Sequence, residues 1–342
     1  MGEPLDSAPT PMLYAADACG VGDGSGAAGS VGRTLGRFTR SLDSSRSHRR
    51  RVVDALSWLS MVAFAGSETQ DDAAAEWVPL PGRAVQAWRD LIDGLMRHWM
   101  WTSLAVQDMK IRYRGSLLGP FWVTISTFVM VVAMGLIYSH LFHSTTDNYM
   151  PYLGLGLIVW QLISSLITEG CSTFMMAEQI IQQIPVPFSI HAYRVVCRNF
   201  LVFGHNLVIV PIGLIVFRIP VDWHLLGAVA GCFVLAINGV WIAIFLGMVS
   251  TRFRDIAPIV ASFLQVVFFL TPIFWPIDAL GVYRPIAEFN PLFCAIDVIR
   301  APLLAVPVEP TSWPILIAAS VVGSAITFIF FARYRSRIAY WV

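Results

Sequence analysis

Six long apolar segments constrain this chain more than any other feature of its sequence. Each is close to the length of about 20 residues that a helix needs to cross the hydrocarbon core of a bilayer. Only 13% of the residues are charged, whereas soluble proteins contain about 25%. We therefore predict an all-α integral membrane protein with six transmembrane helices. The predicted spans are residues 121–142, 152–176, 200–217, 225–250, 256–275 and 313–332.

The basic residues lie mostly on one side of these predicted spans. From residue 97 onwards, eleven Lys and Arg residues fall on one side, and only Arg218, Arg284 and Arg300 fall on the other. Membrane proteins concentrate Lys and Arg in their cytoplasmic loops. We therefore expect the eleven basic residues, and both termini, to be cytoplasmic.

Residues 1–83 differ in composition from the rest of the chain. Small, polar and helix-breaking residues dominate stretches such as "ACGVGDGSGAAGSVG", which is typical of disorder. An Arg-rich stretch followed by about 14 apolar residues resembles a signal segment, but it begins too late and is too short to span a membrane. We expect a disordered extension over residues 1–83 and a transmembrane domain over residues 84–342. The alternative is that translation begins at Met61.

Residues 84–107 have the pattern of one amphipathic helix. Apolar residues recur every three or four positions on one face, and charged residues occupy the other. This pattern predicts a helix that lies in the membrane interface. The apolar face consists of Trp88, Leu91, Ile92, Leu95 and Trp99, and the charged face of Arg89, Asp90, Asp93 and Arg97.

Two of the connections between predicted spans have sequences that predict helices and not simple loops. Between the second and third spans, isoleucines alternate with glutamines before two prolines, which predicts a short amphipathic helix that forms a docking surface. Its key residues are Ile180, Ile181, Ile184, Pro185 and Pro187. Between the fifth and sixth spans, helix breakers alternate with short apolar pieces such as residues 291–304. We expect re-entrant helices there, because irregular backbone at membrane depth must be covered by protein.

The chain has a single lysine, Lys110, and Ile111 follows it. A phosphate-binding loop needs a lysine after glycine and before Ser or Thr. If ATP drives this protein, another polypeptide must hydrolyse it, so we predict no enzymatic activity and no cofactor for this chain. The five cysteines show no paired spacing, and we predict no metal site. A net charge of +1 argues against nucleic-acid binding.

Several motifs, in order along the chain, resemble one family. They are "QDMKIRYRGSLLGPFW", "RFRDI", "FFLTPIFWP", "NPLFCAIDVIRAPLL" and the terminal "RYRSRIAYWV". Together they resemble the membrane-spanning subunit of ABC-2 type polysaccharide exporters, which export O-antigen, capsule or similar glycans. The resemblance covers residues 84–342. It implies a homodimer in the inner membrane that works with two copies of a separate ABC ATPase, which carries ATP and Mg. It also implies a lipid-linked polysaccharide as substrate.

We predict a substrate entrance and gate from charged residues next to the spans. Glu169 is the only acidic residue inside a predicted span, and such residues are costly in membranes and often functional. It either pairs structurally with Arg194 or Arg198 or acts in gating. Guanidinium groups bind phosphate through paired hydrogen bonds. The predicted entrance and gate residues are Lys110, Arg112, Arg114, Glu169, Arg252, Arg254 and Asp255. Arg252 and Arg254 could equally be topology signals, and Asp255 a helix cap.

Aromatic residues can guide a sugar polymer by stacking on its ring faces. We predict that Phe268, Phe269, Phe274 and Trp275 form a pore or outer gate, because they adjoin the re-entrant segment. The resemblance places coupling to the ATPase in the isoleucine and proline residues after the second span. The leading functional hypothesis is export of a lipid-linked polysaccharide. The alternatives are ABC-2 export of a smaller lipid or drug, a membrane-embedded glycosyltransferase and a secondary transporter.

Overall fold

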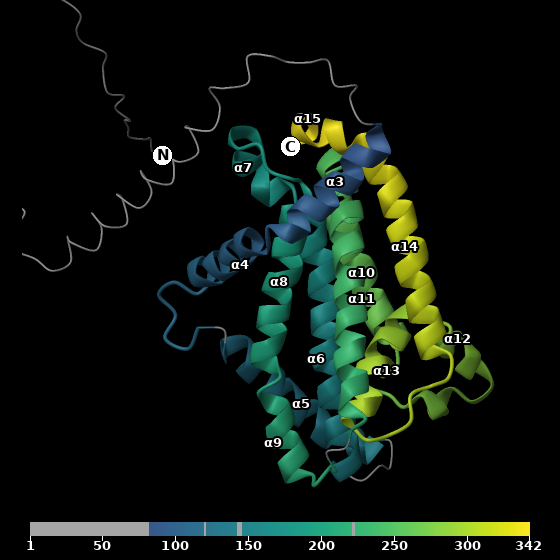
Figure 1. The fold of residues 1–342 in the computed structure, drawn as a ribbon. Helices are drawn as coiled ribbons and strands as arrows, with labels where there is room; N and C mark the ends of the chain where they lie inside the picture. The colour runs from purple at the N-terminus through teal and green to yellow at the C-terminus, as the bar shows by residue number, and fades with distance from the viewer. Residues whose placement is uncertain (1–81, 120, 142–145, 221–222) are drawn as a thin grey trace, which may run out of the picture. The chain divides into compact units, whose positions relative to one another are not determined.

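The computed structural model describes residues 82–119, 121–141, 146–220 and 223–342, and all regular structure in them is helical (Figure 1). The predicted extension lies outside the described residues except for its last two, as does the alternative start at Met61. Five helices are long and apolar enough to cross a membrane, the third of them interrupted. They are α5 (Phe121–Leu141), α6 (Thr146–Cys171), α8 (Ser189–Asn206) with α9 (Ile209–Val216), α10 (Leu225–Arg252) and α14 (Ser312–Tyr334).

The remaining helices are shorter. They are α3 (Arg83–Met96), α4 (His98–Arg112), η1 (Met175–Ala177), α7 (Glu178–Gln183), α11 (Ile256–Leu270), η2 (Ile277–Tyr283), α12 (Arg284–Glu288), α13 (Pro291–Leu303), η3 (Arg335–Arg337) and α15 (Ile338–Trp341). The predicted fifth span corresponds to α11, which is apolar but has only 15 residues. The short helices η2, α12 and α13 occupy the predicted re-entrant region. The side chain of Asn290 caps α13 by accepting a hydrogen bond from Leu292 N at 3.0 Å.

The segment after α11 leaves the helix although it remains apolar, so the predicted span limit at Trp275 is wrong by five residues. Pro272 has no amide hydrogen, and its ring would meet the carbonyl group four residues earlier, so continuing the helix through it would cost about 3 kcal/mol. Side chains of α6 bind the released carbonyl groups. Tyr152 Oη donates to the carbonyls of Pro272 (3.3 Å) and Trp275 (3.2 Å), and Tyr149 Oη donates to that of Phe274.

The helix of the third predicted span begins eleven residues earlier than residue 200. It therefore includes Arg194 and Arg198, which the prediction placed in a loop. The helix is interrupted between α8 and α9. Pro211 lies just after this point, and it cannot donate the hydrogen bond that would continue the helix across the interruption.

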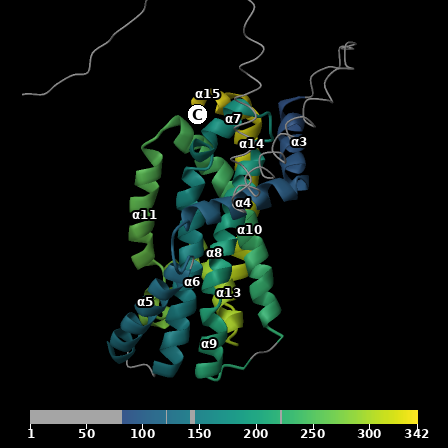
Figure 2. The ribbon, with the colours of Figure 1, turned by 90° about the vertical axis from the view of Figure 1, so that its left-hand side faces the viewer.

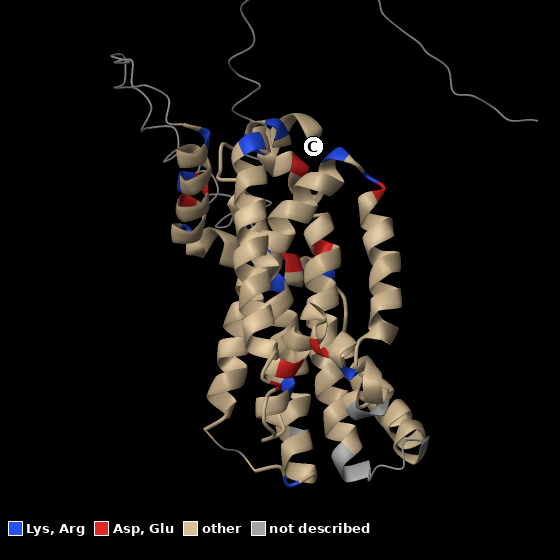
Figure 3. Ribbon diagram, turned by 90° about the vertical axis from the view of Figure 1, so that its right-hand side faces the viewer, with Lys and Arg blue, Asp and Glu red and all other residues tan. Residues whose placement is uncertain are grey.

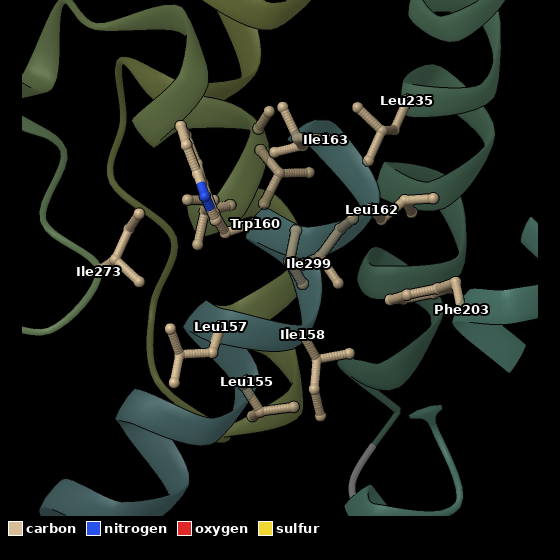
Figure 4. Close-up of a cluster of buried hydrophobic side chains, with 14 of the residues drawn as sticks. Leu155, Leu157, Ile158, Trp160, Leu162, Ile163, Phe203, Leu235, Ile273 and Ile299 are labelled. Atoms are coloured by element: carbon tan, nitrogen blue, oxygen red, sulfur yellow. The ribbon is translucent and has the colours of Figure 1, made fainter. Parts of the chain in front are cut away.

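The core of the bundle forms around α6. Of its apolar window, 61% is buried, whereas the corresponding window of α5 is only 17% buried. Figure 4 shows side chains of α6 meeting Phe203 of α8, Leu235 of α10, Ile299 of α13 and Ile273 after α11. The α6 helix is therefore central, and α5 lies at the edge of the bundle.

The predicted interface helix consists of two helices, α3 and α4, which meet at Arg97 and run in different directions (Figure 2). The break lets α3 pack against α8 and α14 while α4 packs against α8. The predicted charged face is also wrong at one position, because Asp90 is only 3% exposed. Trp88 and Ile92 on the predicted apolar face remain exposed, as expected for a helix that contacts lipid.

Candidate functional site

Five charged side chains from three helices form a connected set, named here the charged cluster: Asp108 and Arg112 of α4, Glu169 of α6, and Arg194 and Arg198 of α8. Arg112 Nη2 donates to Glu169 Oε1 at 2.8 Å, and Arg198 Nη2 donates to Glu169 Oε2 at 2.8 Å. Arg198 Nη1 donates to Asp108 Oδ2 at 2.8 Å, and Arg194 Nε donates to the same oxygen at 2.7 Å. Figure 3 shows acidic and basic residues close together inside the bundle as well as at its C-terminal end.

The members of the charged cluster differ in exposure. The side chain of Arg198 is 3% exposed, whereas that of Arg112 is 41% exposed. Burial alone would raise the pKa of Asp108, but the hydrogen bond and charge of Arg194, together with Arg198, lower it below its ordinary value. Three guanidinium groups and two carboxylates leave a net charge of +1. The cluster therefore has a fixed buried part and a cationic group that solvent can reach.

A groove of about 930 Å³ lies between α5, α6 and α11. Figure 2 shows α5 and α11 on the same side of α6. Its lining on α6 runs from Leu157 to Thr168, roughly 16 Å at the helical rise of 1.5 Å per residue. Thr168 directly precedes Glu169, so one end of the groove adjoins the charged cluster. We refer to this feature as the α5–α6–α11 groove.

The walls of the α5–α6–α11 groove combine hydroxyl, amide and aromatic side chains. The polar residues are Ser126, Thr127, Gln161, Ser164, Ser165, Thr168 and Gln265, and the aromatic residues are Trp122, Trp160, Phe268 and Phe269. Ser126, Ser164 and Thr168 donate their hydroxyl hydrogens to carbonyl groups of their own helices. Their oxygen atoms therefore remain available as acceptors.

Gln161 holds the two walls of the groove together. Its Oε1 accepts hydrogen bonds from Thr127 Oγ1 of α5 at 3.1 Å and from Asn206 Nδ2 of α8 at 3.0 Å. Asn206 also accepts a hydrogen bond from Thr124 Oγ1 of α5 at 2.9 Å. These bonds satisfy buried polar groups between spans and fix α5 against the core.

The predicted outer-gate aromatic residues come together after α11. The ring centroids of Phe268, Phe269 and Phe274 lie 5.3–6.0 Å from one another, and Trp275 Nε1 donates to the carbonyl of Phe269 at 3.3 Å. Phe268 also contacts Trp160 of α6, with ring centroids 5.6 Å apart. Only the first two of the four predicted residues line the groove.

The predicted entrance residues separate into two groups. Arg112 and Glu169 belong to the charged cluster, and Glu169 makes the predicted pairing with Arg198. The other predicted residues are exposed, and they form no ion pair with any residue that the structure describes. These residues are Lys110, Arg114, Arg252, Arg254 and Asp255. Asp255 occupies the N-cap position of α11, as predicted, but its side chain makes no capping hydrogen bond there.

Sequence analysis did not single out Asp108 or Gln161. For Asp108 a signal was present: it lies four residues before Arg112, just as Arg194 lies four residues before Arg198. Residues four apart share one face of a helix. Asp108 on the first face is opposite in charge to both arginines on the second, which predicts a contact between α4 and α8. For Gln161 the signal was a polar amide within a predicted span, and this residue lines the groove.

The short amphipathic helix predicted between the second and third spans corresponds to α7, which a loop with two prolines follows. Ile180 and Ile181 lie on α7 and are partly exposed, and Ile184 is 49% exposed just after it. Pro185 and Pro187 follow outside any helix, as expected from their lack of amide hydrogens. The segment therefore presents apolar side chains at the surface.

Comparison with known proteins identifies the family. The family model described as ABC-2 type transporter matches residues 101–304, which include the charged cluster and the groove. The chain belongs to the ABC-2 type transporter family. As a family member it is the membrane subunit of a transporter and a multi-pass protein of the inner membrane, as the sequence motifs predicted.

Relatives of this ABC-2 type transporter carry more specific names. An O-antigen export system permease protein RfbA of Myxococcus xanthus is 23% identical over 52% of this chain and 68% of its own length. Two proteins of the same name from Klebsiella pneumoniae are 26% and 25% identical over 54% of this chain and 73% of their own lengths. The family resemblance drawn from the sequence motifs is therefore confirmed.

Proposed function

We propose that this ABC-2 type transporter is the permease subunit of an ATP-driven exporter of a lipid-linked cell-envelope polysaccharide. It acts as a homodimer with two copies of a separate ABC ATPase subunit, which binds ATP and Mg. The observation that carries the proposal is the α5–α6–α11 groove, whose walls suit a sugar chain and which ends at a cationic cluster. The names of the relatives support the same substrate class.

The lining of the groove supports a carbohydrate substrate. Sugar hydroxyls donate and accept hydrogen bonds, and the groove offers both acceptors and amide groups along its length. Sugar ring faces are apolar and stack on aromatic side chains such as Trp122 and Phe269, which are 55% and 60% exposed. A smaller apolar lipid or drug would leave the polar wall without partners, which carries a cost in free energy.

The charged cluster supports a substrate with an anionic lipid-linked phosphate. Arg112 is the exposed cation, and a phosphate group can replace Glu169 as its partner through paired hydrogen bonds. Arg198 keeps Asp108 during this exchange, so the buried charges stay paired. Arg112 would therefore receive the phosphate at the end of the groove, while the other members of the cluster keep their positions.

The exposed edge of the groove supports assembly as a homodimer. Large apolar side chains on α5 and α11 are exposed next to it, including Phe128, Ile259 and Phe263. Two copies that meet along these helices would cover the apolar surface and close two grooves into a channel. The exposed isoleucine residues of the α7 segment support docking of the ATPase subunit.

Affinity purification of the tagged chain from its native membrane tests the proposal directly. We expect a separate ATPase with a phosphate-binding loop to co-purify, and its ATP hydrolysis to rise when lipid-linked glycan is added. If no ATPase co-purifies, the proposed subunit composition is wrong. If it co-purifies and responds only to short lipids without sugars, the proposed substrate class is wrong.

Arg112→Gln is expected to reduce polysaccharide export strongly without loss of the protein. A charge-assisted hydrogen bond contributes about 1.5–3 kcal/mol, so loss of the phosphate contact should lower export roughly tenfold to a hundredfold. The folded state should lose less than about 1 kcal/mol, because the Arg112 side chain is 41% exposed and solvent screens its pair with Glu169. Surface polysaccharide and protein level in the membrane are the two measurements.

Arg114→Gln is the matched control for this prediction. Arg114 lies two residues away, is exposed, and pairs with no residue in the described ranges. Its replacement removes the same charge from the same surface. Equal losses of export in the two variants would indicate a general charge effect and would contradict the role of Arg112.

A further inference from the structure

The side chain of Asp90 on α3 is fully buried among segments that are distant in sequence. Its Oδ1 accepts a hydrogen bond from Ser189 N at 3.0 Å, at the start of α8. Its Oδ2 accepts one from Phe188 N at 3.2 Å and one from Arg335 Nε at 2.6 Å, near the C-terminus. One carboxylate therefore joins α3, the loop before α8 and the segment after α14.

Further contacts hold α3 in place around this carboxylate. Ser189 Oγ donates to the carbonyl of Asp90 at 2.6 Å, and Tyr193 Oη donates to the carbonyl of Leu91 at 3.1 Å. Gly94 lies one turn further along α3, where any Cβ would collide with the Ser189 side chain. The close approach of α3 to α8 thus depends on both the carboxylate and the absence of a side chain at Gly94.

The loop that Asp90 binds is the end of the predicted coupling segment. Asp90 lines a cavity of about 550 Å³ together with Ile181, Ile184 and Pro187. Pro187 has no amide hydrogen, and the N–H of Phe188 is the first donor after it. Because proline restricts the backbone, a displacement of α7 cannot be absorbed easily by this short loop. Asp90 therefore binds the first two amide groups after the last proline of the loop.

The helix that carries Asp90, α3, is linked at its C-terminal end to the charged cluster. Only Arg97 separates α3 from α4, and α4 carries Asp108 and Arg112 near its end. A continuous set of contacts therefore runs from α7 through Asp90 and α3 to α4. A network of this kind is evidence of proximity, and its energetic coupling has to be measured.

We propose that Asp90 is a positioning residue that fastens the α7 loop to α3, so that movement of α7 against the ATPase subunit shifts α4 and opens the Arg112–Glu169 pair. The proposal rests on the proposed function, in which an ATPase subunit docks on α7. Asp90 itself contacts neither substrate nor nucleotide in this scheme. Arg335 completes the attachment by neutralising the buried carboxylate, and its guanidinium also lies 5.5 Å from the centre of the Phe188 ring.

The first experiment measures the attachment itself, without reference to transport. Spin labels are placed at the exposed positions Ala84 on α3 and Gln182 on α7, in the chain reconstituted into lipid nanodiscs. We expect a narrow distance distribution in the parent chain and a broad one in Asp90→Ala and in Arg335→Gln. Asp93→Ala, an exposed acidic residue on the same helix, is the matched control and should leave the distribution narrow. An unchanged distribution in Asp90→Ala would overturn the proposal.

The second experiment measures coupling in the complex with its co-purified ATPase. We expect export per ATP hydrolysed to fall about tenfold in Asp90→Ala, within the usual range for a coupling between two sites, while ATP hydrolysis continues. Arg335→Lys keeps the positive charge and should retain coupling that Arg335→Gln loses. Normal coupling in Asp90→Ala would overturn the proposal.

Two provisions keep the outcomes distinct. If Asp90→Ala is not recovered from the membrane, Asp90→Asn carries the same tests, because its amide oxygen still accepts from Ser189 N but does not neutralise Arg335. If the parent complex exports no polysaccharide, the proposed function fails, and the distance measurement alone decides whether Asp90 holds the α7 loop to α3.

Discussion

Glu169→Ala is expected to destabilise this transporter by about 3–5 kcal/mol, the usual cost of removing one partner from a buried ion pair. Glu169 accepts hydrogen bonds from Arg112, Arg198 and Asn199. The Arg198 side chain is only 3% exposed, so it cannot turn to water when its carboxylate partner is lost. Three guanidinium groups would then share the single carboxylate of Asp108. The measurement is thermal unfolding of the purified chain in detergent.

Two further variants test this explanation. Glu169→Gln keeps an acceptor oxygen but removes the charge, and it should unfold between the parent and Glu169→Ala. Arg112→Gln removes the exposed partner of the same carboxylate and should change the unfolding temperature little. If Glu169→Ala unfolds at the same temperature as Arg112→Gln, the buried pairing with Arg198 does not stabilise the chain, and Glu169 serves gating alone.

Most helices could be predicted from hydropathy, and the failures have specific physical causes. Local hydropathy placed the start of the third span after Arg194 and Arg198, because two cations look like the end of a membrane segment. In the structure, Asp108 of α4 forms ion pairs with both arginines, so α8 can include them within its length. A partner that lies about 90 residues away in the chain cannot be seen in a local window.

The limit of α11 was predictable in principle. The run of residues 268–275 is apolar except for Thr271, and length alone favoured a full span. Pro272 was the signal for an earlier end, since its ring disfavours a helical conformation in the residue before it. The sequence does not show that Tyr149 and Tyr152 donate hydrogen bonds to the carbonyl groups of Phe274 and Pro272 in the non-helical segment.

The candidate site was predicted in part. Arg112 and Glu169 were both among the predicted entrance residues, and Glu169 was expected to pair with Arg194 or Arg198, but its pairing with Arg112 was not predicted. Asp90 was assigned to the solvent-facing side of an amphipathic helix, which is the usual position of such a residue. Its burial depends on Ser189 and Arg335, whose positions follow from the packing of α3 against α8 and α14.

Ala261→Trp is expected to stop polysaccharide export, reducing it to the background of cells that lack the chain. Ala261 lines the α5–α6–α11 groove from α11 and is exposed, so an indole ring can be accommodated without disturbing the core. The ring would occupy space between α11 and the polar wall of α6. Because the substitution adds no charge and touches no member of the charged cluster, protein level and dimer assembly should stay normal. Export is measured as polysaccharide at the cell surface.

Ser262→Trp is the control that makes this prediction specific. Ser262 is the next residue on the same helix, is also exposed, and does not line the groove. It receives the same side chain at the same depth, but a neighbouring position on a helix points about 100° away. If polysaccharide passes along the groove, export should stop in Ala261→Trp and continue in Ser262→Trp. Dimer assembly is measured in both variants, because Ser262 lies three residues from Ile259 on the exposed face proposed to meet the second copy. If both variants export normally, the substrate takes another path through the transporter, and the hydroxyl and aromatic lining of the groove has a different purpose.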